Sequence, residues 1–137
     1  MSGTIVQILE KRTFEFSFLG TSATQDVVIH PAVDVTSYYR VRLLVRIHSI
    51  TTTSGNFKFI LNNTFPSEQD PQEFTDSTNT FLTTGNITAA GTPPNIFNIA
   101  LSSTDPQAFL KVILRATQGT SGNTLYGEFS AALLLRE

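Results

Sequence analysis

The sequence predicts an all-β fold, an antiparallel β-sandwich or jelly roll of about eight strands. Almost every apolar stretch alternates with a period of two, which is typical of half-buried strands. No window shows a sustained helical period with caps, and turn-forming residues separate the apolar runs. A chain of 137 residues has the length of one domain. We therefore expect residues 1–137 to form a single β-sandwich, with an up-and-down barrel as the second choice.

Three runs of alternation carry the strongest strand signal. Residues 13–18 place three phenylalanines on one face and three polar groups on the other. Residues 39–48 alternate apolar with mainly basic side chains, and residues 57–62 continue the pattern. Further runs are residues 5–9, 25–29, 81–87, 96–101, 109–117 and 125–136. The expected core, taken from the apolar faces of the runs, is Phe14, Phe16, Phe18, Val41, Leu43, Val45, Phe57, Phe59, Val112, Leu114 and Phe129.

Turn residues separate these runs. The stretches 54–56 and 119–123 contain Gly and Asn, which tolerate positive φ, so both predict hairpins between neighbouring strands. The prolines fall outside the clear strand interiors, where a missing N–H does no harm. Residues 67–73 and 102–108 each predict a single helical turn at most.

Composition excludes several classes of function. The net charge of −2 argues against a generic nucleic-acid binder, which normally carries a basic excess. Because the chain has no cysteine, it forms no disulfide, thiol nucleophile or Cys-based zinc site. The sequence shows neither a transmembrane-length apolar run nor a signal peptide at its start, so we expect no membrane partner.

Residues for catalysis are scarce. The two histidines, His30 and His48, are expected at surface positions, and no nucleophile elbow of the Gly-x-Ser-x-Gly type occurs. The chain also contains an acidic stretch without Lys or Arg, which carries Glu68, Asp70, Glu73 and Asp76. It lacks the spacing of a calcium loop, and we interpret it as a solvated segment. No glycine-rich phosphate loop precedes a helix, so the sequence predicts no enzyme, cofactor or metal site.

A basic stripe is the most informative surface feature. Arg40, Arg42 and Arg46 project from one face of the long strand, where they can meet phosphates, a carboxylate-lined partner or acids on adjacent strands. With a net charge of −2, we favour pairing within or between subunits over nucleic acid. Apolar residues on otherwise polar strand faces can gather into an interface patch. The candidate interface is Arg40, Arg42, Leu44, Arg46, Ile60, Phe109, Ile113 and Leu134, and it predicts a homo-oligomer.

A family resemblance arises between residues 24 and 64. A short strand, Gln25-Asp26-Val27-Val28-Ile29, leads through Asp34-Val35-Thr36-Ser37-Tyr38 to the long alternating strand and then to Gly55-Asn56-Phe57-Lys58-Phe59. This layout resembles small all-β structural proteins of tailed bacteriophage virions, including capsid-decoration and minor head proteins.

The resemblance implies a non-catalytic virion protein, made in the host cytoplasm, that decorates or stabilises a bacteriophage capsid. Its implied partners are the major capsid protein or another virion protein and copies of itself, with a trimer as the first guess. Two alternatives stay open at this point. One is a receptor- or glycan-binding β-sandwich of a phage fibre or tail, although the chain has no Trp and only three Tyr to form a sugar platform. The other is a hydrolase without a recognisable site.

Overall fold

The computed structural model describes residues 3–18, 24–51, 55–64, 80–88, 97–104, 106, 109–119 and 124–137. Eight strands form its regular structure: β1 (Gly3–Ser17), β2 (Thr24–Asp34), β3 (Arg40–Thr51), β4 (Asn56–Thr64), β5 (Thr80–Thr83), β6 (Phe97–Thr104), β7 (Phe109–Thr117) and β8 (Thr124–Arg136). The predicted all-β class and the number of about eight strands are confirmed.

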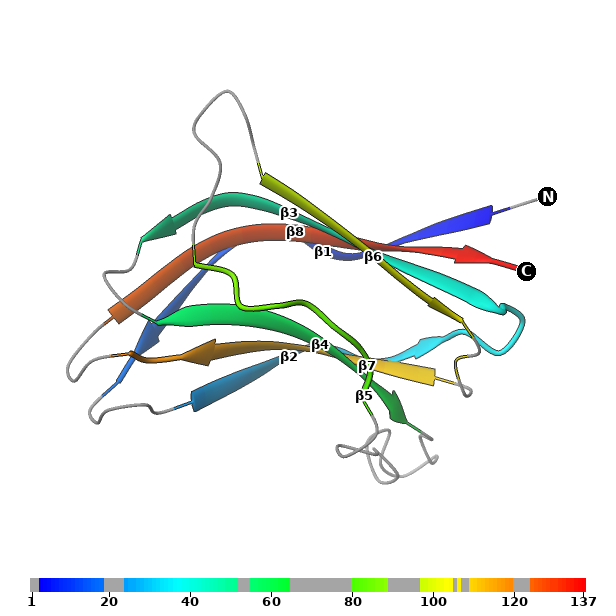
Figure 1. Cartoon of the computed structure of the whole chain (residues 1–137), viewed down its shortest axis with the longest axis horizontal. Coiled ribbons are helices and arrows are strands. Elements are labelled where there is room, and N and C mark those ends of the chain that lie inside the picture. The colour runs from blue at the N-terminus through cyan, green and yellow to red at the C-terminus, as the bar shows by residue number, and fades with distance from the viewer. Residues whose placement is uncertain are drawn as a thin grey trace.

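The strands form two four-stranded antiparallel sheets that lie one above the other (Figure 1). One sheet has the order β1-β8-β3-β6 and the other has the order β2-β7-β4-β5. Consecutive strands alternate between the sheets, except for β4 and β5, which pair with each other. This order is that of a jelly roll, which confirms the first of the two predicted architectures over the up-and-down barrel.

Both predicted hairpins are wrong. The stretch 54–56 lies between β3 and β4, and the stretch 119–123 lies between β7 and β8; the members of each pair belong to opposite sheets. Gly55 does have the expected positive φ, 103°. Turn chemistry marks where the chain changes direction, but a crossing between sheets uses the same residues as a hairpin within one sheet. Only the tertiary pairing decides which strand is the partner.

Several strand boundaries also differ from the prediction: for the expected run 81–87, β5 ends at Thr83 and Ile87 forms only an isolated bridge with Phe57. Residues 5–9 and 13–18 belong almost entirely to one strand, β1, whose bulges between Gln7 and Arg12 interrupt the alternation. Pro31 lies inside β2, which tolerates it because β2 is an edge strand with a bulge between His30 and Val33. Residues 102–104 continue β6 and form no helical turn. The predicted turn at 67–73 lies outside the described residues.

The core lies between the sheets, and every predicted core residue is buried there. Its centre is an aromatic cluster that joins the two sheets. The Phe129 ring on β8 makes edge contacts with the rings of Phe57 and Phe59 on β4, at centroid distances of 5.2 and 5.5 Å. Phe16 on β1 contacts Phe57 at 5.9 Å. Edge-to-face contacts of this kind add to the stabilisation from buried area.

Gly127 leaves room for this cluster, and we expect Gly127→Ala to lower the free energy of unfolding by about 1–3 kcal/mol. A Cβ at this position would clash with the Phe129 ring, lying 2.7 Å from Cζ, and would approach Cζ of Phe57 to 3.1 Å. Both rings are fully buried and cannot easily move away. Urea denaturation measures the loss. The control is Gly3→Ala, whose new Cβ makes only ordinary contacts at 3.5 Å; equal losses in the two variants would contradict this packing.

Candidate functional site

The outer face of the β1-β8-β3-β6 sheet carries most of the predicted interface. Because Val41, Leu43 and Val45 point into the core, the side chains between them point outward. The predicted residues on this face are Arg40, Arg42, Leu44, Arg46 and Leu134. In the β3–β8 register Arg42 is opposite Leu134, and Leu44 is opposite Ala132. The structure therefore brings five of the eight candidates onto one surface, which we call the arginine face.

The other three candidates lie on the opposite sheet, so the single patch expected from sequence does not form. Ile60 on β4 and Ile113 on β7 are register partners and are only 6% and 7% exposed. Phe109 starts β7 and is half-buried. Period-two alternation assigns a residue to a strand face but does not say which sheet the strand joins. That is why residues from two opposite surfaces were grouped together.

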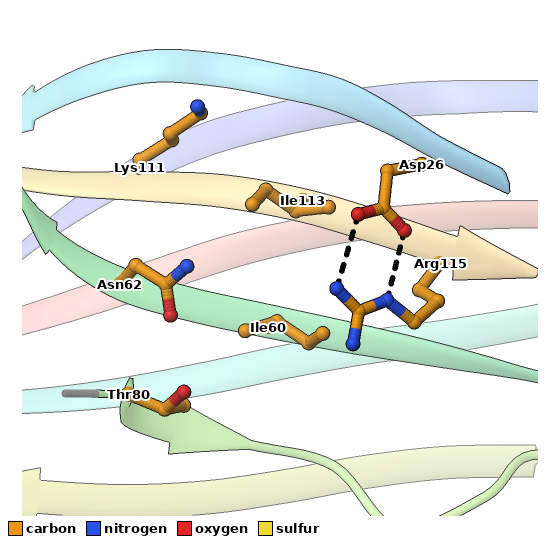
Figure 2. Close-up of a pocket in the computed structure, with 7 residues that line it drawn as sticks. All are labelled: Asp26, Ile60, Asn62, Thr80, Lys111, Ile113 and Arg115. Atoms are coloured by element: carbon orange, nitrogen blue, oxygen red, sulfur yellow. Dashed lines mark hydrogen bonds and ion pairs between the residues drawn. The ribbon is translucent and has the colours of Figure 1, made fainter. Parts of the chain in front are cut away.

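A shallow pocket of about 240 Å³ surrounds Ile60 and Ile113 on the outer face of the second sheet (Figure 2). Asp26 and Arg115 face each other at its rim and form a bidentate ion pair, with N···O distances of 2.8 and 3.0 Å. This pair accounts for the raised pKa of Arg115. The charges at the rim are thus largely matched within the chain, and Lys111 is the pocket's remaining basic group.

On the arginine face, in contrast, the basic side chains are not matched by acids of the same chain. Arg40, Arg42, Leu134 and Arg136 line a hollow of about 110 Å³ near the end of the sheet where both termini lie (Figure 1). In the ladder Arg40 is directly opposite Arg136, and like charges in this position destabilise a sheet. The ion pairs among the described residues are Lys11–Glu128 and Arg115–Asp26, so none of these arginines has an acidic partner there. Of the pairings left open by the sequence, pairing with acids on adjacent strands is not found.

Two residues of this surface were missed by the sequence argument. Arg136 alternates with Leu134 in the C-terminal strand, and that alternation is the signal that could have included it. Ile5 lies on β1 opposite Leu134 and is 69% exposed, the highest value among the large apolar side chains described. Only the pairing of β1 with β8 places Ile5 beside the arginines, because the two segments are far apart in sequence.

The other end of the same face carries acidic groups. Glu128 accepts a hydrogen bond from Thr13 at 3.3 Å and lies 3.8 Å from the Lys11 ammonium. Glu15 accepts a weak hydrogen bond from the Tyr126 hydroxyl at 3.4 Å. The face is therefore polarised along its strands, although its basic groups outnumber its acidic ones.

The histidines do not come together. His30 is on β2, where its Nδ1 accepts a hydrogen bond from the Ala32 N–H at 3.3 Å. His48 is on β3 in the opposite sheet, and its Nε2 lies 2.9 Å from the Ser130 hydroxyl. A serine–histidine pair acts as a nucleophile only beside free donors that can stabilise an oxyanion. Ser130 lies in the interior of β8, where it is the register partner of Arg46 on β3 and faces the bulge of β1 on the other side. We assign no catalytic role to this pair.

His48 gives a pH dependence that can be tested. Burial lowers its pKa below the ordinary value of 6.5, with the nearby charges of Lys11 and Arg46 adding to the shift and Glu128 opposing it. As the pH falls, His48 is therefore protonated at a higher pH in the unfolded chain than in the folded chain. Protonation thus favours unfolding, and the folded state loses stability below about pH 6.5. We expect His48→Gln to reduce the fall in melting temperature between neutral and mildly acidic pH. Identical pH profiles for the variant and the wild type would contradict this assignment.

Within the described ranges, no group of three or more His, Asp or Glu side chains is arranged to hold a metal ion. A helix long and apolar enough to cross a membrane is likewise not found among those residues.

The strand order of the two sheets defines the class of fold, a jelly roll. The chain is similar to the solved structure of infectious bursal disease virus, Gx strain, with a TM-score of 0.57 and 9% identity. It is also similar to the VP2 subviral particle of that virus, with a TM-score of 0.55 and 10% identity. Each match covers 98% of this chain, and at such identities the likeness establishes the fold.

A third similar structure is that of T=1 particles derived from the same virus, with a TM-score of 0.50 and 11% identity over 99% of this chain. The chain spans about a third of the length of the proteins it matches, with 31% to 32% of each covered. No protein-family model matches the sequence, and no curated protein matches it.

Proposed function

We propose that this chain is a non-catalytic structural component of a virus particle and acts through protein–protein contacts. The observation that carries the proposal is the jelly-roll topology, which aligns over 98% of the chain with proteins of virus particles. A jelly roll hosts other functions as well, so fold analogy alone is not enough. The arginine face supplies the second support, because it combines unpaired arginines with the exposed Ile5 and the half-buried Leu44 and Leu134. Arginine is among the residues enriched at protein interfaces.

The more specific form of the proposal keeps the role expected from the phage resemblance. Residues 1–137 act as one β-sandwich unit that decorates or stabilises a bacteriophage capsid, with the virion as its location. Its partners are copies of itself, for which a trimer is the first expectation, and a shell protein. Closed symmetry is the common outcome for soluble homo-oligomers.

Sedimentation velocity and negative-stain electron microscopy of the purified chain test the proposal. We expect a mass above the 15.0 kDa of one chain, and particles or rings when the protein is concentrated. If the chain only decorates, it forms small oligomers alone and binds in a repeating pattern to capsids of its own virus. A chain that stays monomeric and binds no capsid would refute the structural role.

A glycan-binding module is the competing class, and the described aromatic side chains do not favour it. Tyr39 is 57% exposed and Tyr126 is 41% exposed. The Tyr39 N–H bonds to the carbonyl of Arg136 at one end of β8, whereas Tyr126 lies near the other end. Ten residues of strand span about 33 Å, so the two rings form no common platform for a sugar. Strong hits on a glycan array would reverse this ranking.

A further inference from the structure

We propose that the arginine face binds the acidic segment of a second copy of this chain, the stretch that carries Glu68, Asp70, Glu73 and Asp76. The inference deepens the proposed function and rests on it, because it names the partner and the surface for one contact of the assembly. It joins three arginines of this face that have no acidic partner among the described residues, Arg40, Arg42 and Arg136, to a stretch of sequence that carries four acids and no Lys or Arg.

The arginines of the arginine face are spaced so that they can bind several carboxylates. Arg40 and Arg136 are held directly opposite each other by the β3–β8 ladder, and Arg42 follows two residues along β3 on the same face. Neighbouring side chains on one face of a strand are about 6.7 Å apart, so a segment with several acids can meet more than one guanidinium. A guanidinium binds a carboxylate through two parallel hydrogen bonds. Carboxylates placed between Arg40 and Arg136 would remove the repulsion that the ladder imposes.

The charge of the whole chain favours a protein partner over nucleic acid. Four of the nine basic side chains, Arg40, Arg42, Arg46 and Arg136, lie on the arginine face. The remaining five basic side chains stand against eleven acidic ones, two of which, Glu15 and Glu128, lie at the other end of the same face, so the molecule away from the arginines is negative. A polyanion that approached the arginines would meet this negative field, whereas a second copy of the chain brings the complementary surface itself.

The apolar side chains beside the arginines also favour a protein partner over nucleic acid. The arginine hollow is lined by Leu134 and adjoins the exposed Ile5, which lies opposite Leu134 in the β1–β8 ladder. The acidic segment contains Phe74 between Glu73 and Asp76. Apolar contact at the centre of a charged rim is the usual composition of a specific interface. A phosphate backbone offers no apolar counterpart to the exposed Ile5 and the half-buried Leu134.

The position of the segment in the chain favours contact between copies. Residues 65–79 connect β4 to β5, and both strands belong to the sheet β2-β7-β4-β5. The arginine face is the outer surface of the other sheet and points away from these strands. Within one chain the segment would have to pass around the sandwich, whereas in a second copy it has no such constraint. A contact between two different surfaces of identical chains builds rings or extended arrays.

A charge-swap experiment tests the inference on the full-length chain. One variant carries Arg40→Glu and Arg42→Glu, a second carries Glu68→Arg and Asp70→Arg, and a third carries all four changes. Sedimentation velocity over a concentration series at low and high salt measures self-association. The matched control carries Lys58→Glu and Lys111→Glu, which change the charge by the same amount on the opposite sheet.

We expect each double charge reversal to weaken self-association at least about tenfold, and the control to leave it unchanged. A mixture of the two reversed variants should associate again, because the new glutamates of one meet the new arginines of the other. The fourfold variant should also self-associate. Circular dichroism checks that each variant folds; if a reversal unfolds the chain, Arg42→Gln and Glu68→Gln repeat the test with a smaller change.

Several results would overturn the inference. One is a wild-type assembly that Arg40→Glu with Arg42→Glu does not weaken, in which case the proposed structural role stands without this contact. Another is a mixture of the reversed variants that stays dissociated. A third is binding of a single-stranded RNA oligonucleotide that Arg40→Glu with Arg42→Glu abolishes while self-association persists, which would assign the arginines to nucleic acid. A wild type that neither assembles nor binds a capsid refutes the proposed function itself.

Discussion

Phe129→Ala is expected to lower the free energy of unfolding by about 3–5 kcal/mol, the range typical for truncation of a buried phenylalanine. The Phe129 ring is fully buried on β8 and contacts Phe57 and Phe59 on β4, so it joins the two sheets. Its removal takes away apolar area and leaves a cavity that the rigid ladders on both sides cannot close. Urea denaturation followed by circular dichroism measures the change, and a loss of this size approaches the whole stability of a typical domain.

The control for this prediction is Tyr126→Ala on the same strand. The Tyr126 ring is 41% exposed, so its truncation should cost far less than that of Phe129. A double-mutant cycle with Phe59→Ala adds a second check, because contacting residues give non-additive effects. Equal losses for Phe129→Ala and Tyr126→Ala would show that β8 has a different register.

Gly55→Ala is expected to cost about 2–5 kcal/mol, because it combines backbone strain with a clash. Gly55 has a φ of 103°, a conformation that residues with a side chain rarely adopt. An added Cβ would lie 2.6 Å from the carbonyl oxygen of Thr117 and 3.0 Å from Leu125. The carbonyl belongs to the backbone at the end of β7, so it cannot turn away as a flexible side chain would.

Gly85→Ala is the matched control for this prediction. An added Cβ at Gly85 meets no atom within 4 Å, and the φ of this glycine lies outside the left-handed region. Thermal unfolding of both variants by calorimetry compares them directly. If Gly55→Ala unfolds at the same temperature as Gly85→Ala, the tight approach of β4 to the end of β7 is wrong.

The core could be predicted from sequence because alternation is a local property. Residues such as Phe14 and Phe16, or Val41 and Leu43, are two positions apart, and a strand places both on one face whatever it pairs with. The same reasoning located Arg40, Arg42 and Arg46 on a single outer surface. The bulges of β1 and the proline in β2 were missed, since both depend on these strands being at the sheet edges.

The candidate interface could be predicted only in part, because the local sequence does not show which sheet a strand joins. Leu44 and Ile60 have similar sequence surroundings, with basic or polar residues on both sides. Leu44 lies on the arginine face, whereas Ile60 lies on the other sheet and packs beside Ile113. No local pattern separates these cases, because burial of an outward-facing side chain depends on what the neighbouring strands place around it.

The all-β class, the approximate number of strands and the inward face of the predicted strands follow from side-chain alternation along each strand, so they can be read from the sequence. The jelly-roll order, in which the turns at Gly55 and Gly119 carry the chain between sheets, depends on which strands pair and is seen only in the folded chain. The tertiary pairing also decides that Arg40 meets Arg136 and that Ile5 meets Leu134. Pairings between distant segments depend on the combined free energy of all contacts in the fold, and no local pattern encodes them.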